Sequence, residues 1–371
     1  MWAIWCAGIA LLAALAWRLP AQSPPEVDWT RGTLRLYRSV PLARWDAGWY
    51  YLVAVNGYHY DPKVLANTIG FYPLYPLLLR AAAAALPSVS IFVVGILLSM
   101  LFLLGALLLV ARLSELWDGP ETRLPAIAAI LFFPTSFFYA SVYTESLFLL
   151  TTAAAIASAR ANRWILAGFA GAAAGLTRLN GCLILVPLAY LAWEGSARRW
   201  RFPGRTWTGL GLALAGVLAF PAYLGVRFGD PLLYVHEKSN AFWSPRPGAP
   251  WKTAWRIGKE AWRRLADPAA EGRLLFLSGV ACFLVFLALS VLLLRRGLVA
   301  EGLYAVATLL FLLCGGTFDG IQRYVLALFP CFFPIAGVLR RSPVLAFAYA
   351  FLGIGTGVVL LHRFVHSIFV A

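Results

Sequence analysis

Four ionisable residues lie next to long apolar stretches of this 371-residue chain: Asp46, Glu145, Arg178 and Arg323. A charged side chain in or at the mouth of a membrane span is costly, so each position needs a reason. Arginine offers paired donors to phosphate oxygens and stays charged at any working pH. A carboxylate can accept a proton from an attacking hydroxyl while arginines stabilise a departing phosphate. These residue types would suit sugar transfer from a lipid-linked sugar phosphate.

Each of the four also has a purely structural interpretation. Glu145 can pair with Arg178 as an ion pair at the rim of the helices. Arg178 can instead cap a helix or reach lipid headgroups, and Arg323 has the same alternatives. Asp319, just before Gly320, is expected to be a turn residue rather than a catalyst.

Asp46 has the most unusual surroundings of the four. It lies in Arg44-Trp45-Asp46-Ala47-Gly48-Trp49-Tyr50-Tyr51, where a carboxylate, an arginine and several aromatic residues are crowded together. Apolar residues recur there at helical spacing, which predicts an amphipathic helix at the membrane interface with Asp46 near its first turn; they are Leu42, Trp45, Trp49, Leu52 and Val53. An aromatic interfacial belt without a catalytic role is the alternative.

The composition places the chain in a membrane. Hydrophobic residues make up 61% of it, charged residues only 13%, and the mean hydropathy is +0.76. Such values are too apolar for a soluble domain, and no gap between apolar runs is long enough for a second domain. We therefore predict one all-α polytopic domain over residues 1–371. Five scattered cysteines form no CxxC pair and are interpreted as packing residues.

Apolar runs predict about eleven transmembrane helices, several of them short for a bilayer of about 30 Å. They lie near residues 2–17, 89–111, 124–140, 143–159, 164–177, 179–193, 207–226, 273–294, 298–314, 321–339 and 343–361. Residues 1–5 carry no Lys or Arg, so we expect the first run to be a retained anchor rather than a cleaved signal peptide.

Arginines predict the orientation, because they fall in alternate short loops that should be cytoplasmic; they are Arg112, Arg123, Arg160, Arg163, Arg198, Arg199, Arg201, Arg205, Arg295, Arg296, Arg340 and Arg341. The N-terminus is then cytoplasmic. Two long loops, about residues 18–88 and 227–272, lie outside, and the first should contain interfacial helices. All four candidate residues come to the outer ends of helices.

Other kinds of site find little support in the sequence. His362 and His366 share a helix face but have no third ligand nearby, and His59 and His236, in the two outer loops, are either substrate contacts or ordinary loop residues, with the latter favoured. HExxH, GxSxG, Walker A and GxGxxG signatures are absent, as are nucleic-acid motifs. Basic residues outnumber acidic ones by 31 to 16, which in so apolar a chain indicates lipid headgroups or phosphates.

An ordered set of short motifs resembles the PIG-V family. It comprises Trp45-Asp46 with Gly57-Tyr58, Phe71-Tyr72-Pro73-Leu74-Tyr75-Pro76, Phe133-Pro134-Thr135, Tyr143-Thr144-Glu145-Ser146-Leu147-Phe148, Leu176-Thr177-Arg178 with Gly181, Gly229-Asp230-Pro231 before Trp243, and Arg323-Tyr324 before Phe329-Pro330. The best-known members are the eukaryotic glycosylphosphatidylinositol mannosyltransferases II. A compact chain rich in arginine and alanine looks like a prokaryotic member, so the eukaryotic acceptor is not carried over.

The resemblance implies a GT-C glycosyltransferase that uses a polyprenyl-phosphate sugar, typically mannose, on the non-cytoplasmic face with inversion. On this pattern Asp46 resembles the general base, and Arg178 and Arg323 resemble donor phosphate-binding residues. Seven residues are expected to bind substrate or support the site: Arg44, Trp45, Trp49, Tyr72, Tyr143, Glu145 and Tyr324. No cofactor or metal is expected, although Asp46 with Glu145 could hold a divalent ion.

Three functions compete at this stage. The first is a membrane mannosyltransferase acting on a lipid or lipid-anchored acceptor. The second is a transporter or flippase of a lipid-linked saccharide, although such proteins usually show internal repeats and midplane charges. The third is a silent partner subunit that binds a lipid-linked sugar and tolerates the loss of Asp46.

Overall fold

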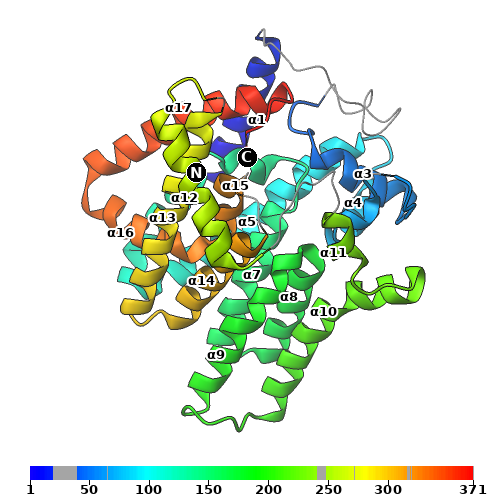
Figure 1. The fold of residues 1–371 in the computed structure, drawn as a ribbon. Helices are drawn as coiled ribbons and strands as arrows, with labels where there is room; N and C mark the ends of the chain where they lie inside the picture. The colour runs from blue at the N-terminus through cyan, green and yellow to red at the C-terminus, as the bar shows by residue number, and fades with distance from the viewer. Residues whose placement is uncertain are drawn as a thin grey trace.

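The computed structural model describes residues 1–19, 40–64, 66–239, 248–270, 272–315, 318 and 320–370, and these residues contain helices and no strands (Figure 1). The α-helices are α1 (Trp2–Arg18), α3 (Asp46–Asn56), α4 (Leu74–Ala85), α5 (Ile91–Asp118), α6 (Arg123–Leu131), α7 (Glu145–Arg160), α8 (Trp164–Thr177), α9 (Leu185–Gly195), α10 (Gly204–Phe228), α11 (Leu233–Lys238), α12 (Pro250–Ala266), α13 (Arg273–Arg295), α14 (Val299–Cys314), α15 (Ile321–Tyr324), α16 (Phe332–Arg341) and α17 (Pro343–Val365). Short 3₁₀ helices are η1 (Thr68–Gly70), η2 (Pro120–Thr122), η3 (Ser136–Ala140), η4 (Leu179–Ile184), η5 (Val325–Ala327) and η6 (Phe329–Cys331).

The count of about eleven spans is not confirmed. Among the described residues, four helices are long and apolar enough to cross a membrane (α5, α10, α13 and α17), and a bent pair over residues 321–341 makes five. Several predicted spans are broken helices. The run 124–140 divides into α6 and η3 around Pro134, the run 179–193 into η4 and α9, and the run 321–339 bends by 88°. Proline removes a helical hydrogen bond, which hydropathy does not register.

Small residues let α8 and α10 pack closely side by side (Figure 1). A Cβ atom added at Gly168 of α8 would come within 2.5 Å of the Gly209 carbonyl oxygen on α10. Such close backbone approach is the usual way in which helices associate in lipid, where hydrophobic burial supplies no driving force between them.

The arginines that end α7 and α16 form ion pairs at one end of the helical bundle. α5 and α7 run in the same direction, since Ser99 donates a hydrogen bond to the Tyr143 carbonyl and Gly105 lies against Leu150. The C-terminal ends of these two helices carry ion pairs to the ends of other helices: Asp118 accepts hydrogen bonds from Arg340 and Arg341 in the last turn of α16, and Arg160 pairs with Glu301 in the first turn of α14. Glu145 begins α7 and therefore lies at the opposite end of the bundle from these arginines.

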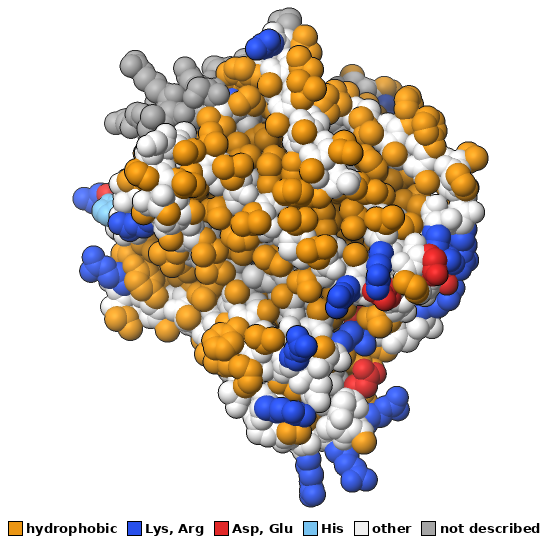
Figure 2. Space-filling model, turned by 180° about the vertical axis from the view of Figure 1, so that it is seen from behind, with side chains coloured by type: hydrophobic (Ala, Val, Ile, Leu, Met, Phe, Trp, Pro, Cys, Tyr) orange, Lys and Arg blue, Asp and Glu red, His pale blue; other side chains and the backbone are white. Residues whose placement is uncertain are grey.

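The outer surface reflects the same division. Figure 2 shows a broad hydrophobic face, with Lys and Arg side chains at its lower end and at its left and right edges. The loop between α9 and α10 contributes exposed arginines there, namely Arg198, Arg199, Arg201 and Arg205. A wide apolar surface bordered by charged side chains is typical of a protein embedded in lipid.

The amphipathic helix predicted from Leu42 onward begins later than expected. α3 starts at Asp46, while Trp45 has a φ of +53° and Leu42 is buried outside the helix. The positive φ explains the difference, because no right-handed helix can include such a residue. Trp45 is 42% exposed and Trp49 is half-buried, so they do not form one interfacial stripe.

Candidate active site

Asp46 is held in place by the residues before it. The buried Arg44 donates hydrogen bonds to the carbonyl oxygens of Val365, Val40 and Ala43. The Tyr143 hydroxyl in turn donates to the Arg44 carbonyl oxygen at 3.0 Å. Arg44 thus fixes the chain just ahead of α3, so that Asp46 occupies the first turn, where a carboxylate is favoured by the helix dipole.

The strained Trp45 completes this turn. Its positive φ is uncommon for a bulky residue and persists only where the surroundings enforce it. Its ring lies edge-on to Phe369 with centroids 6.4 Å apart. Of the predicted supporting residues, Arg44 and Trp45 therefore orient Asp46 through the backbone.

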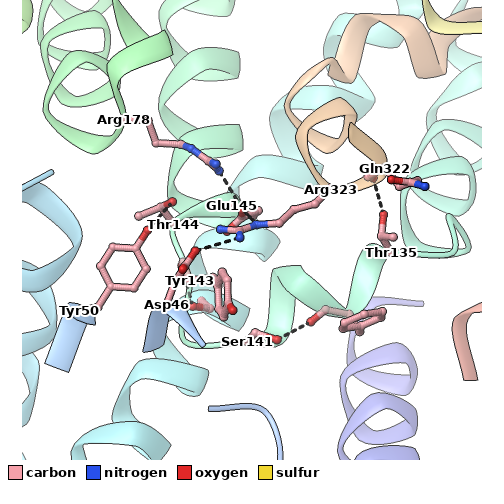
Figure 3. Close-up of polar contacts among 12 residues, drawn as sticks. Asp46, Tyr50, Thr135, Ser141, Tyr143, Thr144, Glu145, Arg178, Gln322 and Arg323 are labelled. Carbon is pink, nitrogen blue, oxygen red and sulfur yellow. Dashed lines mark hydrogen bonds and ion pairs between the residues drawn. The ribbon is translucent and has the colours of Figure 1, made fainter. Parts of the chain in front are cut away.

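Four charged side chains that are far apart in sequence form one connected cluster (Figure 3). Arg323 donates from Nη1 to Asp46 Oδ2 at 2.9 Å and from Nε to Glu145 Oε1 at 2.5 Å. Arg178 donates from Nη1 to the same Glu145 oxygen at 2.8 Å. The residues come from α3, α7, the turn after α8, and α15, so the fold brings together all four ionisable residues selected from the sequence.

The cluster is charge-balanced and mostly withdrawn from solvent. The side chain of Glu145 is 2% exposed and those of Arg323 and Arg178 are 10% and 15%, whereas Asp46 is 26% exposed. Glu145 Oε2 is buried and has no hydrogen-bond partner among the described residues. Because burying ions is costly, the pairing with two arginines is what permits Glu145 at this depth. Asp46 is the carboxylate that a ligand can reach most easily.

Aromatic rings line the two arginines. The Arg323 guanidinium lies 4.4 Å from the Tyr143 ring centroid, and the Arg178 guanidinium lies 5.4 Å from that of Tyr324. Trp49 stacks on Phe71 one turn after Asp46, at 5.5 Å. These contacts place Tyr143, Tyr324 and Trp49 at or beside the cluster.

Tyr72 lies in a second, smaller core instead. Its ring packs against Phe220 at 4.8 Å and Tyr234 at 4.9 Å. This core joins the first predicted outer loop to α10 and α11. The Tyr72 ring therefore packs between those segments. Of the two roles predicted for Tyr72, binding substrate or supporting the site, this packing is compatible with the second.

Lys238, which the sequence analysis did not select, faces the same cluster. Its ammonium lies 4.6 Å from the centroid of the Phe71 ring. Burial lowers the pKa of Lys238 to about 8, with Arg323 and Arg178 acting in the same direction and Asp46 and Glu237 opposing them. A cation whose pKa responds to three of the four charges belongs to the same electrostatic unit.

A buried carboxylate positions the helix that carries Lys238. Glu237 is 4% exposed and accepts hydrogen bonds from the Asn67 backbone amide at 2.7 Å and from its side-chain amide at 3.2 Å. These bonds hold α11 against η1. The Gly229-Asp230-Pro231 motif marked this region in the sequence, but nothing in the spacing indicated that Lys238 lies close enough to Asp46 for the two charges to interact.

The described residues contain no group of three or more His, Cys, Asp or Glu side chains that could hold a metal ion. Asp46 and Glu145 are both bonded to Arg323, so a cation between them would have to displace a guanidinium. His362 and His366 are neighbours, and the latter's Nε2 lies 3.0 Å from the Ala16 carbonyl oxygen. Asp319 and Trp243 lie outside the described residues.

Comparison with known proteins links this site to glycosyltransferases. Residues 19–195 match the family described as mannosyltransferase (PIG-V), a stretch that includes Asp46, Glu145 and Arg178 but not Arg323. GPI mannosyltransferase 2 of Drosophila melanogaster is 26% identical over 181 residues, which is 45% of this chain and 39% of that protein. The match thus spans well under half of the length of this curated relative.

The fold has a counterpart among solved structures. The crystal structure of ArnT from Cupriavidus metallidurans bound to undecaprenyl phosphate aligns with a TM-score of 0.50 and 13% identity, over 95% of this chain and 62% of ArnT. An oligosaccharyltransferase from Archaeoglobus fulgidus aligns with a TM-score of 0.44, too low to carry an argument. Residues 19–195 are thus similar to the mannosyltransferase (PIG-V) family, and the chain as a whole shares the fold of ArnT, with several helices long and apolar enough to cross a membrane.

Proposed function

We propose that this protein transfers a sugar, mannose in the first instance, from a polyprenyl-phosphate donor to a lipid or lipid-anchored acceptor. The observation that carries the proposal is the bridge made by Arg323, which contacts Asp46 and Glu145 together. Asp46, the partly exposed carboxylate, therefore lies beside Arg323 and close to Arg178, whose side chains are largely buried. The family match supports the sugar, and the lipid phosphate named in the ArnT structure supports the type of donor.

In the proposed reaction Asp46 is the general base. The acceptor hydroxyl attacks the anomeric carbon from the face opposite the phosphate, its proton passes to Asp46, and the bond from the anomeric carbon to the phosphate oxygen breaks. The configuration at the anomeric carbon is inverted. Polyprenyl phosphate departs with one more negative charge than it carried as the donor.

Arg178 and Arg323 are proposed to hold that phosphate. Arg178 makes one hydrogen bond to a described residue and Arg323 makes two, so each guanidinium retains N–H groups for phosphate oxygens. Glu145 accepts from both side chains and keeps their planes in place. This combines the two interpretations considered for Glu145, because the ion pair itself organises the phosphate site.

Lys238 supplies the charge that the cluster lacks. Two carboxylates and two guanidiniums cancel, which leaves no net positive charge for a departing phosphate. A cationic Lys238 beside them makes the balance positive, as stabilisation of a developing anion requires. We propose that Lys238 assists the departure of the phosphate.

The site is proposed to face the non-cytoplasmic side with the N-terminus in the cytoplasm. Support comes from the arginines that end α7 and α16, which lie at the end of the bundle away from Glu145. Arginines in short loops are expected on the cytoplasmic side. No cofactor is required by the proposed reaction.

The test is transfer by purified protein supplied with labelled polyprenyl-phosphate mannose and total membrane lipids from its host. Asp46→Asn should remain folded and lose about 10²–10⁴-fold in rate, the usual contribution of a general base. Asp118→Asn is the matched control, since its side chain is 29% exposed and also pairs with arginine, but at the other end of the bundle. Near-normal transfer by Asp46→Asn would remove its role, and lipid translocation without a glycosidic product would indicate a flippase.

A further inference from the structure

Helix α12 (Pro250–Ala266) presents its apolar side chains away from the protein. Trp251, Trp255, Trp262 and Leu265 are 71%, 68%, 75% and 56% exposed. At 100° per residue these four positions fall within an arc of about 80° on one side of the helix. The described part of the chain thus has a continuous stripe of three tryptophans and a leucine that no other element covers.

The face of α12 that packs against the protein is the more polar one. Thr253 is buried there, and Glu260 accepts a hydrogen bond from Arg264 one turn later. Arg264 also lies over the ring of Phe276 in α13 at 4.7 Å. A helix bordering water would have the reverse arrangement, with its apolar side inward. The outward stripe therefore requires a medium other than water.

Cations flank the stripe along one edge. Lys252, Lys259 and Arg263 are exposed and lie at about 80–120° from Trp251 around the helix. Arg263 also pairs with Glu260 at 2.7 Å, so the two lysines carry the net positive charge of this edge. Lys259 also lies 5.2 Å from the Trp255 ring centroid. Tryptophans beside lysine and arginine on one helix are the residues that settle at the boundary between acyl chains and anionic headgroups.

The position of α12 agrees with such a boundary. The helix lies beside α13 and α14 (Figure 1), and the Gly248 amide just before it donates to the Cys314 carbonyl at the end of α14. Gln322 donates to the Leu275 carbonyl in the first turn of α13, and Arg323 follows it directly. α12 therefore lies at the end of the α13–α14 hairpin that is nearer to the candidate active site.

We propose that α12 is an interfacial anchor whose tryptophan stripe enters one membrane leaflet and whose cations bind anionic lipid headgroups there. The occupant of this surface is the leaflet itself, since three adjacent cations match anionic headgroups and the indole rings match headgroup depth. This inference does not depend on sugar transfer. Lys252 and Lys259 should each contribute about a fivefold preference for anionic over neutral lipid, and Arg263, which is paired with Glu260, should contribute less.

A spin label measures the depth of α12 in the full-length protein. Gly258 lies within the stripe and a side chain added there meets no other atom within 4 Å, so Gly258→Cys carries the label without distortion. The protein, with its native cysteines replaced, is reconstituted into vesicles of phosphatidylcholine alone or with phosphatidylglycerol. Asp267→Cys, exposed just beyond the helix, is the aqueous reference.

The label at 258 should be accessible to oxygen and shielded from a water-soluble nickel chelate, with greater shielding when phosphatidylglycerol is present. Exchanging Lys252, Lys259 and Arg263 for glutamine should abolish that lipid dependence, whereas the same exchange at Arg198, Arg199 and Arg201 should not. Equal access of the chelate to positions 258 and 267 would overturn the proposal. Dipolar broadening that disappears on dilution with unlabelled protein would also overturn it, because a second copy would then cover the stripe.

Discussion

Replacing Glu145 by glutamine separates its structural contribution from its contribution to the site. Glu145 Oε1 accepts from Arg178 at 2.8 Å and from Arg323 at 2.5 Å, and the side chain is 2% exposed. Glu145→Gln keeps the shape but removes the charge that two buried guanidiniums share. The glutamine carbonyl oxygen can still accept at the Oε1 position, while its amide NH₂ group takes the place of Oε2, which has no hydrogen-bond partner among the described residues. Only Asp46 would then oppose both arginines.

The magnitude follows from the burial of the partners. Removing one member of a buried ion pair costs about 3–5 kcal/mol, because the remaining charge is left uncompensated. At about 1.3 °C per kcal/mol for a chain of this size, the midpoint of thermal unfolding should fall by about 4–6 °C. Transfer activity should fall as well, because the arginines lose the acceptor that fixes their planes.

A double variant makes the reasoning testable. Glu145→Gln combined with Arg178→Met restores the balance, since Arg323 keeps Asp46 as its partner at 2.9 Å. The unfolding midpoint of the double variant should be higher than that of Glu145→Gln alone, because the effects of substitutions at interacting residues are not additive. If Arg178 holds the donor phosphate, activity should stay low, and the KM for the donor should remain raised.

Two results would contradict this account. A single Glu145→Gln variant as stable as the wild-type protein would show that the buried pairing carries little energy. A double variant that regains both stability and transfer would show that the ion pair is purely structural and that Arg178 does not touch the donor. Unfolding midpoints in detergent at one fixed scan rate, with activity measured on the same samples, give both answers.

Three further predictions concern other parts of the molecule. Arg160→Met leaves the fully buried Glu301 without its bidentate partner and should lower the free energy of unfolding by up to about 3 kcal/mol. Adding Glu301→Leu to this variant should restore part of the lost stability. An unchanged unfolding midpoint in Arg160→Met would contradict this prediction. The activity of the wild-type protein should fall as the pH rises through about 8, where Lys238 loses its proton. The Lys238→Gln variant should be slower, and its activity should not fall over this pH range. A pH profile unchanged by the substitution would show that Lys238 is not part of the site. Gly353→Ala should lower the unfolding midpoint because its Cβ would clash with the Phe132 carbonyl oxygen, whereas Gly355→Ala, which meets no atom within 4 Å, should not; equal midpoints would refute the close packing of α17.

Hydropathy alone predicted the class of fold but not its spans. Long uninterrupted runs such as α5 and α13 satisfy the length and apolarity needed to cross a bilayer. The run 124–140 has a similar composition, yet α6 stops at Leu131 and the chain continues through turns into η3. In a protein interior such breaks are tolerated because neighbouring groups satisfy the freed backbone. The Ser136 hydroxyl, for example, donates to the Leu131 carbonyl at 2.7 Å.

The members of the site were predictable because of where their charges occur. Asp46, Glu145, Arg178 and Arg323 are charged residues beside apolar segments, which is costly enough to single them out. The pairing among them was not predictable, since Arg323 lies 277 residues from Asp46 along the chain. Lys238 was not predicted because it lies in a polar segment, where a charged residue is common and carries no desolvation penalty that would single it out. Its burial depends on Glu237 and Asn67, a contact between residues 170 positions apart.

The arrangement of Arg323 also suggests how donor binding and proton transfer depend on each other. In the structure one Arg323 guanidinium serves both carboxylates, through Nη1 to Asp46 and through Nε to Glu145. A phosphate that enters the site competes for these N–H groups. Glu145 is the more deeply buried and has a second partner in Arg178, so Asp46 is the carboxylate that a phosphate would displace. The proposed base would then lose its hydrogen bond to Arg323 when the donor arrives, which frees Oδ2 for the acceptor hydroxyl. In the empty site the same oxygen stays occupied, so the pairing that holds the cluster together also keeps the base from acting before the donor binds.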